Sequence, residues 1–289
     1  MTTLQTVAVI GAGVIGRGVA QDCAEHELDV VLVDRDPAIL EAALAEIRQQ
    51  ARLYAMLRKR THDPVRVLSR IHATTSLESI GAADVVVENV TEHEEIKAAV
   101  WDGLARWART DALLAANTSC IPIASFAARV PRPERVVGLH FMNPVALTTM
   151  VEVVRGQATH DETLSAALAF LRRLDKTGIV VADRPGFAIN RVLMPTLNEA
   201  IWVVHDGVAS AVDVDRLFIG CLGHKMGPLA TADLIGLDTV LRSLDVLHAS
   251  SGDPKFAPCP LLVRLVSEGH LGRKSGRGFF FHGAAEEAS

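Results

Sequence analysis

Polar side chains occur at and within strand-like apolar runs in the middle of the chain, where a buried sheet should be apolar. Ser119 and His140 each come shortly after such a run, and Glu152 interrupts the run 150–154. A carboxylate flanked by valines should be largely buried, and a buried carboxylate needs a partner. A Glu–His pair fixes the imidazole tautomer and stabilises its cationic form, so these residue types predict general acid–base chemistry at His140.

For His140 alone, a histidine satisfied within the core is the better interpretation. The carboxylate of Glu152 and the hydroxyl of Ser119 reverse that weighting, because ionisable groups that converge with a hydroxyl in a crevice are typical of active sites. Asn190 lies one helical turn into the segment 185–191, and its amide could point back into the same crevice. Taken alone, that segment would be an ordinary helix N-terminus.

A glycine-rich turn at residues 11–16, with the sequence GAGVIG, follows one apolar run and opens a helical pattern. Its glycines allow a tight bend, a close approach of the backbone to a pyrophosphate at the helix N-terminus, and close packing of helix on strand. Asp34 ends the next apolar run, where its carboxylate can bind a ribose and repel a 2′-phosphate. This predicts NAD over NADP, although Arg35 could accept the phosphate and a glycine turn can also bind nothing. The predicted cofactor contacts are Gly11, Gly13, Val14, Ile15, Gly16 and Asp34.

The first part of the chain alternates short apolar runs with longer amphipathic ones. Strands are expected at 6–10, 29–33, 71–75, 84–88, 112–116, 135–139, 150–154 and 178–181. Helices are expected at 14–26, 39–60, 92–109, 123–130 and 163–174. This alternation predicts an α/β fold with a Rossmann-type, mostly parallel sheet whose strand carboxyl ends line the ligand crevice.

From Pro185 onward almost only helical periodicity remains. Helices are expected there at 187–205, 211–221, 231–250 and 261–270. Proline and glycine interrupt the pattern at 183–186, which indicates a domain boundary. We therefore predict an NAD-binding domain at 1–183, an all-α C-terminal domain at 184–283 and a tail at 284–289.

The composition of the 289-residue chain limits the class of protein. Hydrophobic residues make up 49% and charged residues 22%, which allows a buried core and excludes intrinsic disorder. A net charge of −5 argues against a duplex nucleic-acid partner. No secretory signal is visible, and the apolar runs fall far short of the about 18 residues that suggest a membrane span. The cysteines lack disulfide or metal-ligand spacing and the segment 93–97 lacks a second histidine for zinc, so we expect a cytoplasmic protein without a metal.

Taken together, the motifs resemble the 3-hydroxyacyl-CoA dehydrogenase family, including its bacterial 3-hydroxybutyryl-CoA enzymes. The resemblance runs over residues 7–281 and is carried by GAGVIG at 11–16, ENVTE at 88–92, NTS at 117–119, GLHFMNP at 138–144, VEVV at 151–154, PGFAINR at 185–191, MGPL at 226–229 and GRKSGRGF at 272–279. It implies NAD as cofactor, a 3-hydroxyacyl thioester such as an acyl-CoA as substrate, and a homodimer formed through the helical domain.

The resemblance also implies roles for individual residues. His140 resembles the catalytic base, and Glu152 resembles the partner that orients it. Ser119 and Asn190 resemble the groups that hydrogen-bond the substrate oxygen and the nicotinamide region. Further positions at which the family contacts cofactor or substrate are Glu92, Lys97, Asn117, Asn143 and Lys274.

Some segments depart from the family pattern and leave alternatives open. The helical hairpin that precedes residue 84 is shortened around 61–64, and the basic cluster 58–60 beside it could meet phosphates or be a solvated helix end. Segments 144–149 and 221–233 are similar to a branch that oxidises hydroxyacyl groups on an acyl carrier protein, toward hydroxymalonyl or methoxymalonyl extender units. Two further alternatives are a free hydroxy-acid dehydrogenase, like the related L-gulonate enzymes, and a non-catalytic NAD-binding protein, like the lens crystallins of this family.

Overall fold

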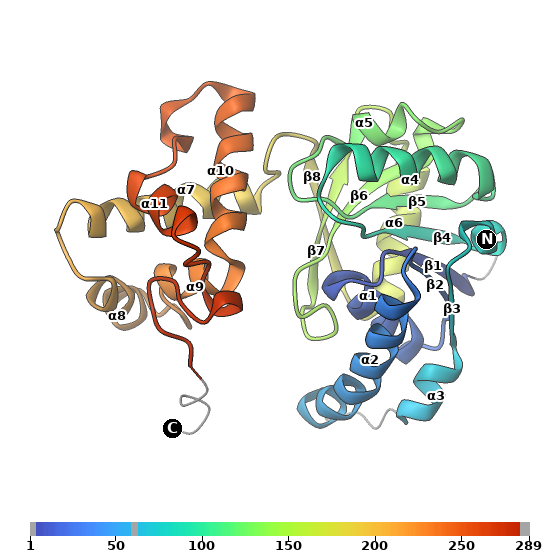
Figure 1. The fold of residues 1–289 in the computed structure, drawn as a ribbon. Helices are drawn as coiled ribbons and strands as arrows, with labels where there is room; N and C mark the ends of the chain where they lie inside the picture. Colours follow the sequence, from blue (N-terminus) through green and yellow to red (C-terminus); the bar gives the residue numbers. More distant parts are fainter. Residues whose placement is uncertain (1–3, 59–62, 284–289) are drawn as a thin grey trace. The chain divides into compact units, whose positions relative to one another are not determined.

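The structure of the chain is a computed structural model that describes residues 4–58 and 63–283. Two compact units divide the chain, the first ending at Arg184 and the second beginning at Pro185. The first unit holds a sheet and the second is helical (Figure 1). No helix within the described ranges is long and apolar enough to span a bilayer.

An eight-stranded sheet in the order β3-β2-β1-β4-β5-β6-β7-β8 forms the centre of the first unit. The strands are β1 (Thr6–Ile10), β2 (Asp29–Val33), β3 (Ile71–Thr74), β4 (Val85–Glu88), β5 (Leu113–Ala116), β6 (Val136–His140), β7 (Met150–Arg155) and β8 (Thr177–Ala182). Neighbouring strands run parallel except β6 and β7, which are antiparallel. The predicted fold class, a Rossmann-type and mostly parallel sheet followed by a helical domain, is confirmed. The predicted strand 135–139 differs at its end, because His140 itself pairs with β7 and belongs to β6.

Helices cover both faces of this sheet. They are α1 (Val14–Glu25), α2 (Pro37–Arg58), α3 (Pro64–Ser69), α4 (Glu94–Trp107), α5 (Ile123–Ala127) and α6 (Asp161–Arg173), with short 3₁₀ helices at Leu77–Ala82 and Pro133–Arg135. Helix α3 was not predicted from the sequence, because a helix of six residues is too short to show periodicity. Asp63 caps it by accepting a hydrogen bond from Val65 N at 3.0 Å, and Pro64 fills its first position.

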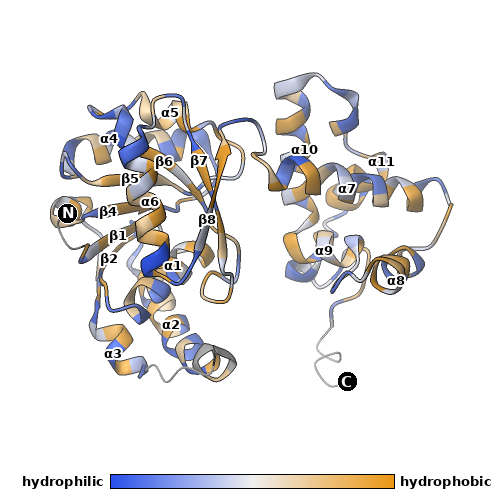
Figure 2. Ribbon diagram, turned by 180° about the vertical axis from the view of Figure 1, so that it is seen from behind, coloured by the Kyte–Doolittle hydropathy of each residue, from blue (hydrophilic) through white to orange (hydrophobic). Residues whose placement is uncertain are grey.

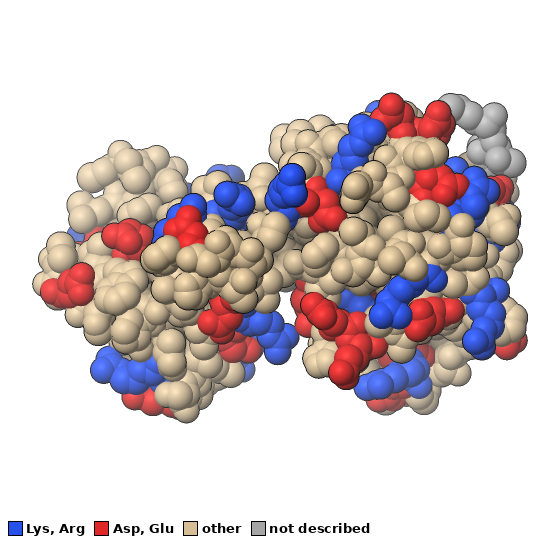
Figure 3. Space-filling view, turned by 90° about the horizontal axis from the view of Figure 1, so that it is seen from above, with Lys and Arg blue, Asp and Glu red and all other residues tan. Residues whose placement is uncertain are grey.

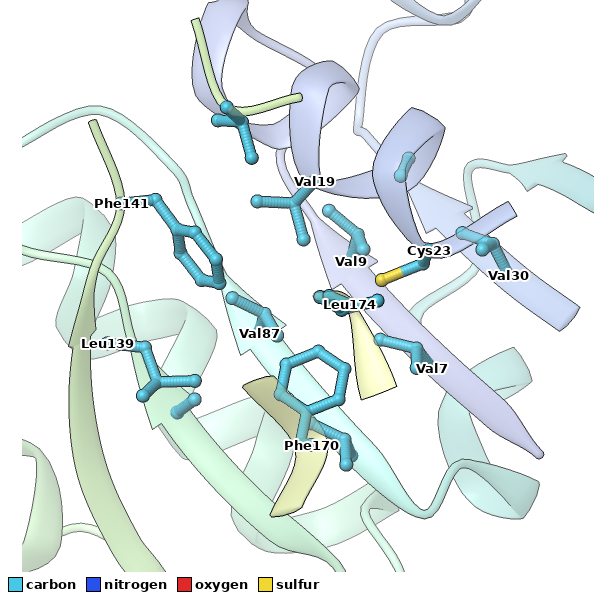
Figure 4. Packing of buried hydrophobic residues seen from close by; sticks show 14 of the residues in the cluster. Val7, Val9, Val19, Cys23, Val30, Val87, Leu139, Phe141, Phe170 and Leu174 are labelled. Carbon is cyan, nitrogen blue, oxygen red and sulfur yellow. The ribbon is translucent and has the colours of Figure 1, made fainter. Parts of the chain in front are cut away.

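The main core lies between one face of the sheet and helices α1 and α6. Val7 and Val9 of β1, Cys23 of α1 and Phe170 of α6 are among its buried members (Figure 4). Successive side chains of a strand point to opposite faces, so the residues between them, such as Ala8, face the other side of the sheet. The continuous valine runs of the central strands follow from this, because a strand covered on both faces must be apolar throughout.

The second unit packs five helices around a separate core. They are α7 (Ile189–His205), α8 (Ala211–Leu222), α9 (Pro228–Ile235), α10 (Leu237–Ser251) and α11 (Pro260–Ser267), with 3₁₀ turns at Pro254–Phe256 and Arg273–Ser275. The core includes Met194, Leu229, Leu244 and Leu262. The helices carry alternating hydrophobic and hydrophilic stripes (Figure 2), as expected where one side of each helix is buried.

The prediction of one continuous helix at 231–250 is wrong. Helix α9 ends at Ile235 and α10 begins at Leu237, because Gly236 between them adopts φ +101° and ψ 123°, which no helix contains. Apolar residues keep helical spacing on both sides of the break. The periodicity therefore could not show that the chain changes direction there.

Candidate active site

The imidazole of His140 and the carboxylate of Glu152 form a buried pair. The antiparallel register sets His140 of β6 directly opposite Glu152 of β7, which puts both side chains on the same face of the sheet. His140 Nδ1 lies 2.7 Å from Glu152 Oε2, and the two side chains are only 6% and 5% exposed. The partner predicted for the buried carboxylate is thus the one that the structure provides.

Ser119 completes a chain of three side chains. It follows β5, which is the parallel neighbour of β6, so the carboxyl ends of both strands meet at one edge of the sheet. Ser119 Oγ lies 3.0 Å from His140 Nε2. Because a carboxylate only accepts, the hydrogen-bond network places the imidazole proton on Nδ1 and leaves Nε2 as the basic nitrogen toward Ser119.

The loop that carries Ser119 is fixed by Glu92. Glu92 Oε1 accepts hydrogen bonds from the Thr118 hydroxyl at 2.5 Å, from Ser119 N at 2.9 Å and from Cys120 N at 3.1 Å. Three donors on one carboxylate oxygen hold the backbone on both sides of Ser119. The structure therefore brings Glu92, which was predicted as a cofactor or substrate contact, next to the His140 site.

Lys97 is fully buried in α4, and its ammonium contacts protein groups. Lys97 Nζ lies 2.9 Å from Glu88 Oε1 at the end of β4 and donates to the backbone oxygen of Asn117 at 2.8 Å. Burial raises the pKa of Glu88, and the contacts with Lys97 and Trp101 offset this only in part. These contacts support a role for Lys97 in placing the Asn117 carbonyl, and its predicted contact with the cofactor stays a prediction.

Asn117 links the ends of three neighbouring strands. Its side-chain oxygen accepts from Phe141 N at 3.1 Å, directly after β6, and its amide donates to Asn89 Oδ1 at 2.8 Å, directly after β4. Asn117 is therefore part of the scaffold around His140. Asn143 lies further along the loop after β6, where it is exposed.

The glycine turn has the shape that a dinucleotide requires. At Gly16 a Cβ atom would lie 1.8 Å from the backbone oxygen of Gly11, so only glycine fits there, whereas a Cβ at Gly13 would meet nothing within 4 Å. Helix α1 starts at Val14 without a side-chain cap on its first amides. Asp34 Oδ2 accepts from Ala12 N at 2.8 Å, which fixes the carboxylate beside the turn. An open helix N-terminus with a tethered acid fits a pyrophosphate and a ribose.

Two predicted site residues belong to the second unit. Asn190 lies at the start of α7 and is 8% exposed. Lys274 lies in the 3₁₀ turn Arg273–Ser275, with its ammonium 2.6 Å from the carboxylate of Asp238. Neither contacts a predicted site residue within its own unit, and their roles stay predictions. The basic cluster 58–60 lies outside the residues whose side chains the structure describes.

Several residues that support the site were not singled out from the sequence. Glu88, Trp101 and Thr118 are buried polar or aromatic groups whose partners lie on other elements: Trp101 Nε1 of α4 donates to Glu88 of β4, and the Thr118 hydroxyl donates to Glu92. The sequence signals were the carboxylate of Glu88 at the end of a valine run and the motifs 88–92 and 117–119, which contain Glu88 and Thr118. Among the described residues, no group of three His, Cys, Asp or Glu side chains could hold a metal ion.

Comparison with known proteins identifies the family. Residues 6–184 match the model of the NAD binding domain of 3-hydroxyacyl-CoA dehydrogenase, and residues 186–282 match the model of its C-terminal domain. The chain belongs to the 3-hydroxyacyl-CoA dehydrogenase family. The predicted family and the predicted cofactor, NAD, are thereby confirmed.

Individual family members are similar over nearly their whole length. A probable 3-hydroxybutyryl-CoA dehydrogenase of Bacillus subtilis is 43% identical, covering 96% of this chain and 97% of that protein. The 3-hydroxybutyryl-CoA dehydrogenase of Bradyrhizobium diazoefficiens is 40% identical, covering 98% and 97%. The crystal structure of (S)-3-hydroxybutyryl-CoA dehydrogenase PaaH1 from Ralstonia eutropha superposes with a TM-score of 0.92 at 38% identity, covering 97% of this chain and 100% of that one. The similarity therefore extends over both units.

Proposed function

We propose that this family member interconverts a 3-hydroxyacyl thioester and the corresponding 3-oxoacyl thioester by NAD-dependent hydride transfer, with His140 and Glu152 as the acid–base pair. The observation that carries the proposal is the chain Ser119–His140–Glu152, in which both imidazole nitrogens have a partner within hydrogen-bond distance. A base oriented by a buried carboxylate, next to a hydroxyl, is the arrangement that alcohol oxidation needs.

In the direction of oxidation, the proton of the substrate hydroxyl passes to Nε2 of His140. Bound NAD supplies the acceptor for the hydride that leaves C3. Glu152 stabilises the imidazolium that results, because its carboxylate lies 2.7 Å from Nδ1 in a buried setting where charges interact strongly. In the reverse direction the imidazolium returns the proton to the developing alkoxide. Ser119 holds the substrate oxygen in line with Nε2.

Other residues bind and orient. Gly11, Gly13 and Gly16 admit the pyrophosphate at the start of α1, and Asp34 accepts from the adenosine ribose. The open space at Gly13 and the hydrogen bond that Ala12 N donates to Asp34 support this assignment. The predicted contacts that complete the cofactor and substrate sites are Val14, Ile15, Glu92, Lys97, Asn117, Asn143, Asn190 and Lys274.

The carrier of the acyl group is proposed to be coenzyme A. Support comes from the relatives, which are named 3-hydroxybutyryl-CoA dehydrogenases and are up to 43% identical. A free hydroxy acid would need a cation for its carboxylate. Lys97 is a buried cation near this site, but its ammonium is already bound to Glu88 and to the backbone oxygen of Asn117. It is therefore not available to a substrate carboxylate.

The test offers the purified protein NAD with (S)-3-hydroxybutyryl-CoA, with the same acyl group on acyl carrier protein, and with free 3-hydroxybutyrate. We expect reduction of NAD with the CoA ester and little with the free acid, read as absorbance of the reduced cofactor. Faster turnover on the carrier protein would contradict coenzyme A as carrier. Turnover of the free acid alone would contradict a thioester substrate, and NAD binding without turnover of any substrate would contradict catalysis.

We also propose that the protein is a homodimer that pairs through α7 and α8. An apolar groove of about 580 Å³ lies between these helices and is lined by residues such as Pro195, Ala200 and Phe218. Next to it, α8 exposes Leu217, with 56% of its surface accessible, and Leu222, with 64%. An apolar groove beside apolar side chains on one unit is typical of a surface that a second copy covers. Charged groups on the face shown in Figure 3 are, by contrast, mixed in sign, which does not favour a polyanionic partner there.

A further inference from the structure

A buried ammonium lies against the loop that joins β6 and β7. Lys176 lies one residue before β8, and its side chain is 3% exposed. Its Nζ donates to the backbone oxygens of Val145 and Thr148, each at 2.6 Å, and lies 3.1 Å from Asp22 Oδ2 in α1. The ammonium therefore donates two hydrogen bonds to backbone carbonyls, and the Asp22 carboxylate balances its charge as an ion pair.

The loop contacted by Lys176 covers residues 141–149, between His140 at the end of β6 and β7, which carries Glu152. Within it, Leu147 N and Thr148 N both donate to Pro144 O, at 3.1 and 3.0 Å, which makes one compact turn. Both ends of the loop are anchored to the sheet, since Phe141 N donates to Asn117 and Thr149 O accepts from Thr177 N at 2.8 Å. The backbone oxygens of Val145 and Thr148, within the turn itself, are held by Lys176. Asn143, a predicted cofactor and substrate contact, lies at the start of that turn.

The same ammonium connects the loop to the cofactor-binding helix. Asp22 is fully buried in α1, the helix whose N-terminus is the proposed pyrophosphate site. The loop also packs directly on that helix, since a Cβ at Gly18 would lie 3.0 Å from Val145 Cβ. His26 adds to the network, with Nδ1 3.6 Å from Asp22 Oδ1. The missing side chain at Gly18 allows the loop to pack against α1. The Lys176–Asp22 ion pair then fixes the distance between the loop and this helix.

We propose that Lys176 is a positioning residue for hydride transfer, which fixes the 141–149 loop against α1 so that Asn143 meets the bound cofactor. The inference rests on the proposed function. Burying an ion pair costs several kcal/mol, and an apolar pair of similar volume would stabilise the fold as well. A lysine is needed because only a hydrogen-bond donor can hold the backbone carbonyls of Val145 and Thr148. The catalytic pair itself is held by strand register and does not need Lys176.

The test is a double-mutant cycle of Lys176→Met, Asp22→Asn and the double variant, with Lys255→Met as the control for an exposed lysine. Each single variant leaves one buried charge without its partner and loses stability in urea, whereas the double variant regains part of it. We expect kcat/KM for NAD to fall by about 10- to 100-fold in both variants that lack Lys176. The reason is that a shift of the Asn143 loop by about 1 Å would displace the cofactor from the geometry that hydride transfer requires. The pH midpoint of the remaining activity stays at the wild-type value, and Lys255→Met keeps wild-type kinetics.

The outcomes separate this inference from the proposed function. An inactive wild-type protein would contradict the proposed function, whereas an active wild-type with a fully active double variant would overturn only the role of Lys176. A shifted pH midpoint would also overturn it, because Lys176 would then act on the catalytic pair. Hydrogen exchange of the wild-type protein gives a readout that needs no folded variant. We expect slow exchange at the amides of Leu147 and Thr148, and exchange at the rate of exposed amides would contradict a fixed loop.

Discussion

The imidazole of His140 is held at both nitrogens, by a buried carboxylate on one side and by a hydroxyl on the other. This arrangement selects one tautomer and one ring orientation, which a general base requires before substrate arrives. Glu152 is suited to the proposed role because it is buried, so that its charge is little screened by water. We therefore expect Glu152 to stabilise the imidazolium as well as to orient the ring.

Replacing this carboxylate by an amide tests that role. In Glu152→Gln the amide keeps the size of the side chain but cannot stabilise an imidazolium, so turnover should fall by about 10²–10⁴-fold. The pH profile of the remaining activity should also change. The exposed Glu162 of α6, substituted in the same way, is the control and should keep wild-type turnover. An unchanged pH profile in Glu152→Gln would remove Glu152 from the proton-transfer step.

Asp84 is a second carboxylate whose charge matters, because it stabilises the folded state. It accepts from Gln5 N at 2.8 Å, Thr6 N at 3.0 Å and Arg109 Nη2 at 3.0 Å, which ties β1 and β4 together at their starts. Burial alone would raise the pKa of Asp84, but the two backbone donors and the Arg109 guanidinium together hold it below its ordinary value of 3.8. A lowered pKa in the folded state adds stability above the unfolded value, and that stability is lost as pH falls through the folded value.

The expected result for Asp84→Asn follows from the lowered pKa of Asp84 in the folded state. At pH 7 the variant should lose about 1.5–3 kcal/mol of unfolding free energy, measured in urea, which is the range for hydrogen bonds to a charged group. As the pH is lowered below 3.8, the wild-type should lose this advantage and the two proteins should converge. If the difference in unfolding free energy between the two proteins stays constant as the pH falls, the charge of Asp84 contributes nothing to stability.

The antiparallel pairing of β6 with β7 brings the two central side chains of the site together. An antiparallel pair sets residues directly opposite each other on the same face, and here that register joins His140 to Glu152. The polar residues in apolar runs were therefore enough to predict this pair and Ser119. The sequence could not predict that Glu88 and Lys176 support the site, because their partners depend on which strands and helices become neighbours.

Element boundaries show the same limit. The strands of the first unit could be predicted because a strand buried on both faces must be a run of apolar residues. The break at Gly236 could not, since the residues before and after it, such as Leu229 and Leu244, both face one core. Glycine tolerates either backbone conformation, so its presence alone does not decide whether a helix continues.

The turn from β1 into α1 allows a test at the scale of elements. Gly13→Ala adds a methyl group in open space, so we expect the free energy of unfolding to change by less than about 1 kcal/mol. The methyl group occupies the space for the pyrophosphate, so the dissociation constant for NAD should rise at least about tenfold, or about 1.4 kcal/mol. Titration calorimetry and urea unfolding measure the two effects. Gly81→Ala is the control, and equal NAD affinity in Gly13→Ala and wild-type would place the cofactor elsewhere.

At the scale of the whole molecule, the two units carry different parts of the proposed function. The first holds the acid–base chain and the glycine turn, and the second exposes the apolar surface of α7 and α8. We expect Leu217→Asp to convert the proposed dimer into a monomer, because the new carboxylate would be buried without a partner at the interface. Light scattering after gel filtration measures the mass. Val65→Asp, which changes an exposed valine of α3, should leave the dimer intact, and a wild-type mass equal to one chain would contradict the interface.

The proposed function depends on Nε2 of His140 exchanging a proton with the substrate. The most direct test compares the turnover of (S)-3-hydroxybutyryl-CoA in His140→Gln and in His72→Gln, which makes the same change at an exposed position of β3, with NAD affinity measured in both. We expect His140→Gln to bind NAD like the wild-type protein and to lose turnover by about 10²–10⁴-fold, while His72→Gln keeps wild-type turnover. Turnover near the wild-type value in His140→Gln would exclude His140 as the base.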